Sequence, residues 1–231
     1  IVSRDWSSDV CSSDLGMRLA QIARSEIISE KNRANSLSEI LSPSYFKRYL
    51  DLLDYEISLK LNKEKPGSGS TTHMSIIDSQ GNAASVTTTN GEGCGYIIPG
   101  TGIMMNNMLG EDDLNPDGFH NWETTKRMST MMSPTIVIGD SGPELVLGSG
   151  GSNRIRSAIK QVIVNIFTKN MNLEEAIQAP RIHLEENIIH CESGINTAKL
   201  NFPWSTIHHW HEKNLFFGGV NAVTPTNAVG D

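Results

Sequence analysis

Thr71 is the first residue whose type and setting could do chemistry. It opens a β-branched segment, Thr71–Asp78, directly after the Gly/Ser-rich stretch Gly67–Ser70. A cut between Ser70 and Thr71 would give the threonine a free α-amino group beside its hydroxyl. That amine has a pKa of about 7.7–8.0, close to working pH, so it can be the base that a weakly nucleophilic hydroxyl needs. By itself this pattern is weak evidence, because Gly/Ser linkers followed by Thr-rich strands are common and are mostly ordinary linker-to-strand junctions.

A glycine-rich turn, Gly148–Ser152, could stabilise negative charge. It follows a strand-like segment and precedes a helical pattern, so backbone N–H groups and the positive end of a helix would face one point. Preorganised N–H donors of this kind stabilise the oxyanion of acyl transfer. Many such turns are only tight connections, and the pattern leaves both interpretations open.

Two further clusters carry titratable side chains. The acidic run Glu111–Asp113 could bind an amine, although acidic runs are more often solvated loops. The histidines His208, His209 and His211 could be metal ligands, but no matching Cys, Asp or Glu spacing accompanies them. We therefore expect neither a metal nor another cofactor.

The elements that must position these residues follow one another along the chain. They are helices within 17–61, a hairpin over 71–90 with its turn at 79–82, a hairpin over 132–151 with its turn at 140–142, helices over 153–169 and 172–179, and strand-like residues over 181–192. This order favours a layered α+β architecture over alternating βαβ units.

Composition narrows the class of protein. The chain has 231 residues, 38% of them hydrophobic and 19% charged, which is typical of a soluble globular protein with one sizeable core. Its net charge is −7 and it has no long basic run, so nucleic acid is not an expected partner. No apolar stretch approaches the roughly 18–20 residues of a membrane span.

Four segments, in this order, resemble the small catalytic subunit of the γ-glutamyltranspeptidase (glutathione hydrolase) family. They are TTHMSIIDSQGNAASVTTTN, GTGIMMNNMLGEDD, MSPTIV and GSGGSNRI. The resemblance runs from about Met17 to the end and is densest between Thr71 and Arg181. It implies the N-terminal nucleophile hydrolase fold, an αββα sandwich of two antiparallel sheets between helical layers. It also implies a precursor that cuts itself into a large and a small subunit.

The resemblance implies roles for individual residues. Thr71 matches the nucleophile, which also performs the cleavage after Ser70, and Thr89 matches a threonine that hydrogen-bonds it. His73 is expected to have a supporting role at most. The oxyanion donors are expected at two adjacent positions of the glycine turn, either Gly150 and Gly151 or Gly151 and Ser152.

Substrate binding is expected from a second set of residues. Asp113, with Asp112 second, corresponds to the acid that binds the free α-amino group of a γ-glutamyl compound. The remaining expected contacts are Glu92, Thr130 and Ser152. Two departures stand out: Thr130 and Met131 occupy the places of two carboxylate-binding serines, and Gly91 stands where an asparagine is common.

The resemblance also divides the chain. Residues 1–15 resemble a translated sequencing adapter, 16–70 would be the end of the large subunit with its linker, and 71–231 a C-terminally truncated small subunit. The large subunit is then the expected partner, and the periplasm or the cell exterior the expected location.

The expected reaction is transfer of a γ-glutamyl group, as from glutathione, to water or an amino acid. One alternative is a related acylase acting on glutaryl-type or β-lactam side chains, against which the acidic run counts. Another is a catalytically silent paralogue that only binds γ-glutamyl ligands or partners, against which an intact Thr71 behind a cleavable linker counts.

Overall fold

The computed structural model describes residues 42–44, 47, 71–91, 94–111, 114–115, 118–121, 125, 127–185, 187–197 and 206–231. Contacts divide the chain into two compact units, one of residues 1–64 and 182–211 and one of residues 65–181 and 212–231. The helices predicted within 17–61 lie almost wholly outside the described residues. The division at residues 15 and 70 stays a prediction.

The first predicted hairpin is confirmed. β1 (Thr71–Ile77) pairs antiparallel with β2 (Ala83–Thr89), which places Thr71 opposite Thr89. Asp78 closes the turn, because its carboxylate accepts hydrogen bonds from the backbone N–H groups of Gln80 and Asn82, both at 2.8 Å, and from the Asn82 side-chain amide at 2.7 Å. These bonds, first of all that from the Asn82 side chain, lower the pKa of Asp78. The turn thus fixes the register of the two strands.

The second predicted hairpin is confirmed within a larger antiparallel sheet. β3 (Thr135–Gly139) pairs with β4 (Gly142–Gly150), and the sheet order is β3-β4-β8-β9. β8 (Gly219–Val223) and β9 (Ala228–Gly230) come from a tail in which the sequence predicted no element. β4 is therefore a central strand, and its segment Leu145–Ser149 is buried.

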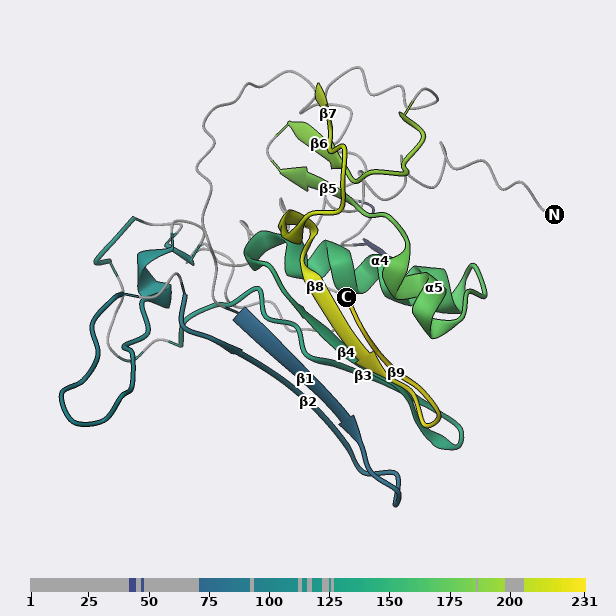
Figure 1. The fold of residues 1–231 in the computed structure, drawn as a ribbon, viewed down its shortest axis with the longest axis horizontal. Helices are drawn as coiled ribbons and strands as arrows, with labels where there is room; N and C mark the ends of the chain where they lie inside the picture. The colour runs from purple at the N-terminus through teal and green to yellow at the C-terminus, as the bar shows by residue number, and fades with distance from the viewer. Residues whose placement is uncertain are drawn as a thin grey trace. The chain divides into compact units, whose positions relative to one another are not determined.

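A helical layer covers one face of this sheet (Figure 1). The 3₁₀ turn η4 (Ser152–Arg154) leads into α4 (Ile155–Phe167), and α5 (Leu173–Gln178) starts at a capping box formed by Asn172 and Glu175, so both predicted helices are confirmed. The core between helices and sheet consists of Leu145, Leu147, Ile155, Ala158, Ile159, Val162, Leu173, Ala176, Ile177, Val220 and Ala222. Each fully buried Leu, Ile or Val side chain there contributes about 1.5–3 kcal/mol.

Hairpin β1–β2 covers the other face of the sheet (Figure 1). The buried ring of His73 fills the space above Gly148, where an added Cβ would lie 2.2 Å from His73 Cε1. Further along β4, a Cβ on Gly150 would lie 2.6 Å from the carbonyl oxygen of Thr71. β1 therefore crosses β4 closely and in the opposite direction. Helices, sheet and hairpin stack as three layers of an α+β fold.

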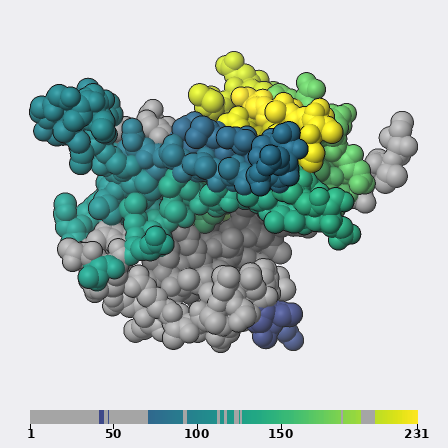
Figure 2. Space-filling model, turned by 90° about the horizontal axis from the view of Figure 1, so that it is seen from below, coloured from purple at the N-terminus to yellow at the C-terminus, as the bar shows by residue number. Residues whose placement is uncertain are grey.

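The outer face of hairpin β1–β2 is apolar and exposed. Met74 is 53% exposed, Ile76 55% and Val86 43%. Figure 2 looks onto this hairpin, which lies on the face turned to the viewer, with the loop that follows β2 projecting beyond it. The alternation of strand side chains thus places His73 in the interior and its neighbour Met74 in solvent.

The other unit contains a three-stranded sheet. β5 (Ile182–Glu185) pairs antiparallel with β6 (Ile188–Cys191), and β6 pairs parallel with β7 (Thr206–His209). Burial raises the pKa of the Cys191 thiol to about 12, which keeps it protonated and unreactive. In the described part of the chain no group of three or more His, Cys, Asp or Glu residues could hold a metal ion. None of the helices found there is long and apolar enough to cross a membrane.

The buried His73 predicts a pH-dependent stability. Burial disfavours the charged imidazolium and lowers the pKa of His73. The unfolded chain therefore binds a proton more readily than the folded one, so the free energy of unfolding falls as pH drops below about 6.5 toward the lowered folded pKa. We expect the thermal midpoint to fall over this window, and less steeply in His73→Gln. Thermal unfolding scans at several pH values measure this, with His120→Gln, a substitution of an exposed histidine, as the control. An equal dependence of the thermal midpoint on pH in wild type and both variants would contradict the prediction.

Candidate active site

The hydroxyl groups of Thr71 and Thr89 meet at the end of hairpin β1–β2. Both side chains are half-buried and lie on the same face of the hairpin as His73. Thr71 Oγ1 donates to Thr89 Oγ1 at 3.0 Å, and Thr89 Oγ1 also accepts the backbone N–H of Gly91 at 3.0 Å. The Thr71 hydroxyl proton is thus directed to one side, which leaves the oxygen lone pairs for another partner.

Asn106 holds the strand end that carries Thr89, a role that sequence reasoning missed. Its side-chain amide donates to the carbonyl oxygen of Thr89, and its Oδ1 accepts the backbone N–H of Met108 at 2.7 Å. The neighbouring Asn107 donates its N–H to the carbonyl of Asn90 at 3.2 Å. The available signal was the pair Asn106-Asn107 at the end of a glycine-rich apolar loop.

Gly91 is explained by the same close approach. Its φ is +67°, and a Cβ there would lie 2.6 Å from Asn107 Oδ1 and 2.7 Å from the backbone nitrogen of Met108. A side chain at this position would displace the 107–108 backbone. The departure from asparagine at Gly91 therefore follows from how this loop folds back onto β2.

The glycine turn lies beside Thr71. Gly150 contacts the Thr71 backbone, Gly151 has a φ of +118°, and Ser152 has a φ of +50° although it carries a side chain. Ser152 opens η4, and the first N–H groups of a helical segment have no acceptor within it. The glycine turn thus lies next to Thr71 at the start of a helical segment, and both predicted donor pairs, Gly150 with Gly151 and Gly151 with Ser152, stay predictions.

A second tight turn supports the glycine turn from behind. A Cβ on Gly218 would lie 2.7 Å from the carbonyl oxygen of Gly150, and a Cβ on Gly151 would lie 2.7 Å from Gly218 Cα. Two backbones cross here at a distance that only glycines allow. Ser149, fully buried, donates its hydroxyl to the Gly150 carbonyl at 2.6 Å.

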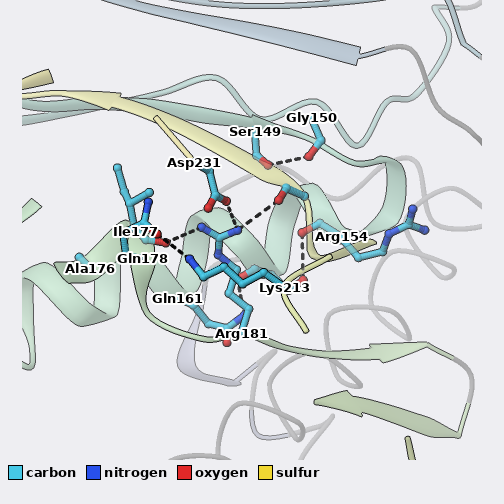
Figure 3. Close-up of polar contacts among 12 residues, drawn as sticks. Ser149, Gly150, Arg154, Gln161, Ala176, Ile177, Gln178, Arg181, Lys213 and Asp231 are labelled. Carbon is cyan, nitrogen blue, oxygen red and sulfur yellow. Dashed lines mark hydrogen bonds and ion pairs between the residues drawn. The ribbon is translucent and has the colours of Figure 1, made fainter. Parts of the chain in front are cut away.

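Two arginines fix the turn that contains Gly218 (Figure 3). Buried Arg181 donates to the Gly218 carbonyl at 3.2 Å and to the Ile177 carbonyl at 2.8 Å, and pairs with Asp231. Arg154 donates from Nε to the Phe216 carbonyl at 2.9 Å and stacks over the Phe216 ring. Sequence reasoning gave neither Arg181 nor this turn a place near the glycine turn, because these contacts join segments far apart in the chain.

The predicted cleavage site and substrate-binding residues are placed only in part. Ser70, Glu92, Asp112 and Asp113 lie outside the described residues and stay predictions. Thr130 is exposed, and its hydroxyl oxygen accepts the backbone N–H of Met132 at 3.2 Å.

Met131 is 5% exposed and packs in an apolar cluster with Met108 and Leu114. The Met108 backbone is part of the segment that closely approaches Gly91, so the cluster adjoins the strand end that carries Thr89. In place of a hydroxyl donor, this position contributes an apolar side chain to a core.

Comparison with known proteins identifies relatives over most of the chain. Residues 16–229 match the family model of gamma-glutamyltranspeptidase. The acylase ACY 1 proenzyme of Pseudomonas sp. (strain SE83) is 33% identical over 158 residues, covering 68% of this chain and 28% of that protein. The glutathione hydrolase proenzyme of Bacillus subtilis (strain 168) is 37% identical over 117 residues, covering 50% of this chain and 20% of that protein. The chain thus spans under a third of the length of these curated relatives.

Solved structures agree with this assignment. The T380A mutant of Helicobacter pylori gamma-glutamyltranspeptidase matches with a TM-score of 0.54 and 30% identity, over 69% of this chain and 96% of that one. The cephalosporin acylase of Bacillus halodurans matches with a TM-score of 0.68 over 94% of this chain and 41% of that one, and at 21% identity it supports the fold alone. The α+β fold is thus that of the N-terminal nucleophile hydrolases, and the chain belongs to the gamma-glutamyltranspeptidase family.

Proposed function

We propose that this protein hydrolyses or transfers γ-glutamyl groups, as from glutathione, after cutting itself before Thr71. The observation that carries the proposal is the hydrogen bond between the hydroxyls of Thr71 and Thr89, at the point where β1 passes over Gly150. A hydroxyl oriented by a partner and set beside a turn of N–H donors is the arrangement that nucleophilic acyl transfer requires.

Self-cleavage uses the Thr71 hydroxyl against its own preceding peptide bond. Oγ1 attacks the carbonyl carbon of Ser70, the bond from that carbon to the Thr71 nitrogen breaks, and the nitrogen leaves with a proton as an amine. The resulting ester is then hydrolysed by water, which gives a carboxylate on Ser70 and a free α-amino group on Thr71. Before the cut the nitrogen is an amide and is no base, so Thr89 is the partner available to the hydroxyl.

Turnover then follows the same path with a γ-glutamyl amide. The Thr71 amine accepts the hydroxyl proton, Oγ1 attacks the γ-carbonyl carbon, and the proton passes to the leaving amine. Water or an amino acid next attacks the γ-glutamyl ester and restores the hydroxyl. Donors from Gly151 and Ser152, or from Gly150 and Gly151, hold the oxyanion, and each such donor is worth about 10²–10³-fold in rate.

The proposal extends to substrate and partner. Asp113, or Asp112 beside it, would bind the α-ammonium group of the donor, with Glu92, Thr130 and Ser152 as further polar contacts. The large subunit released by the cut would remain associated. By family resemblance the reaction belongs in the periplasm or outside the cell.

A related acylase is the second candidate, and the similarity to the acylase ACY 1 proenzyme supports it. A glutaryl group keeps the terminal carboxylate of a γ-glutamyl group and lacks only its α-amino group, so the two candidates differ in whether an ammonium group is bound. The Met131 side chain is buried against Met108 and Leu114 and offers no hydrogen bond to that carboxylate in either case.

Substitution of Thr71 tests the proposal. In the protein expressed from its complete gene, wild type should split into two polypeptides on a denaturing gel, and Thr71→Ala should stay whole, because no hydroxyl is present to attack. The split enzyme should release nitroaniline from a γ-glutamyl nitroanilide faster than from a glutaryl nitroanilide, and Thr71→Ala should release none.

The matched control is Thr72→Ala, one residue further along β1 on the exposed face. It should split and turn over like wild type. An uncut wild type that releases no product from either anilide would overturn the proposal. A faster reaction with the glutaryl anilide would instead establish the acylase.

Thr89 gives a second prediction. Thr89→Val keeps the shape and removes the acceptor of the Thr71 hydroxyl, so kcat should fall about tenfold or more, that is by about 1.4 kcal/mol of transition-state stabilisation. Thr89→Ser should recover most of the rate, and Thr88→Val, on the exposed face of β2, should leave it unchanged. Steady-state kinetics on the processed enzyme measure this; equal rates in the two valine variants would contradict a role for Thr89.

A further inference from the structure

Asn221, in the middle of β8, joins the two stacked sheets. Its side-chain amide donates to the carbonyl oxygen of His73 on β1 at 3.2 Å. In the opposite direction, Ser75 donates its hydroxyl to the Asn221 carbonyl at 3.2 Å. These two bonds tie β1 directly to a strand of the four-stranded sheet, in addition to the pairing of β1 with β2.

Glycines on both strands next to β8 make room for these two hydrogen bonds, which we call the Asn221 joint. Asn221 lies opposite Gly148 on β4 and opposite Gly230 on β9. A Cβ on Gly230 would lie 2.6 Å from Asn221 Oδ1, and a Cβ on Gly148 would overlap the ring of His73. The Asn221 side chain occupies the space beside Gly230, and the His73 ring occupies the space above Gly148.

The Asn221 joint lies two residues from Thr71 along β1 and two residues from Gly150 along β4. Along β1, Thr71 precedes His73 by two residues, and along β4, Gly150 follows Gly148 by two residues. Because β1 runs antiparallel over β4, whatever fixes His73 above Gly148 also fixes Thr71 above Gly150. A displacement of about 1 Å between a nucleophile and its oxyanion donors can cost about 10²-fold in rate.

We propose that Asn221 is a positioning residue, whose bond to the His73 backbone sets the register and spacing of Thr71 over the glycine turn. The inference rests on the proposed function, because its effect is measured through Thr71. The same nucleophile serves self-cleavage and turnover, so loss of the joint should slow both. It should lower kcat and leave KM nearly unchanged, since Asn221 is not among the residues proposed to bind the donor.

The test compares Asn221→Asp with Asn165→Asp in the protein expressed from its complete gene. Aspartate keeps the size of asparagine, but an ionised carboxylate has no N–H to donate and places an oxygen against the carbonyl it faces. Asn165 is the control, because its amide also donates to a backbone carbonyl, that of Ala176 at 3.3 Å, although Asn165 is buried and Asn221 is exposed. That bond joins α4 to α5, in the layer on the other side of the sheet.

We expect Asn221→Asp to slow self-cleavage and lower kcat by about tenfold or more, with KM within about twofold of wild type. Asn165→Asp should lower the thermal midpoint at least as much, because its carboxylate would be buried, and still split and turn over like wild type. Asn221→Ala, which removes the donor without adding a charge, should fall between Asn221→Asp and wild type, and it replaces Asn221→Asp if that variant does not fold.

Two results would overturn the inference in different ways. If wild type splits and turns over, but the Asn221 variants match Asn165→Asp in kcat and cleavage rate at equal stability, Asn221 is structural only. If wild type neither splits nor releases nitroaniline, the proposed function fails, and the positioning role fails with it.

Discussion

The close passage of β1 over β4 is the contact on which the rest of the site depends. It is possible only where β4 has no side chains, at Gly148 under the His73 ring and at Gly150 under the Thr71 backbone. The α4 and α5 core holds β4 from its other face, so the strand cannot withdraw to relieve the contact. Thr71, the proposed nucleophile, is thus held against a packed three-layer body, although it lies at the very start of its strand.

The glycine turn is held in an unfavourable conformation by the same body. Ser152 in the left-handed region costs about 1–2 kcal/mol, and such strain persists only where the surroundings over-determine it. Here the surroundings are the crossing of Gly151 with Gly218 and the arginines that anchor the 216–218 turn. The backbone N–H groups of this turn are therefore held in place in advance, as the proposed oxyanion donors would need to be.

Much of this arrangement could be predicted from local sequence. Polar turns between β-branched runs predicted both hairpins, and the apolar spacing after Asn153 predicted α4. The contact of Thr71 with Thr89 was implied by the family resemblance, and the hairpin agreed with it. The long-range contacts could not be predicted, because nothing near Asn221, Gly218 or Asn106 in the sequence indicates which distant segment each will meet. The sequence showed that Gly91 and Met131 depart from the family pattern, but only the structure explains why. A side chain at position 91 would collide with the backbone, and Met131 packs in an apolar cluster. The acids expected to hold the donor amine stay predictions, since Asp112 and Asp113 lie outside the described residues.

The Asp78 turn has a consequence for how this family can vary in length. Side chains alternate between the two faces of a strand, so one residue added inside β1 or β2 would move one threonine of the Thr71–Thr89 pair to the solvent face and send Met74 or Val86 inward. Two added residues would return each side chain to its original face of the hairpin but would lengthen the strand. Insertions at residues 79–82 leave both strands untouched. Length changes in this hairpin should therefore be confined to its turn, or occur in even numbers within its strands.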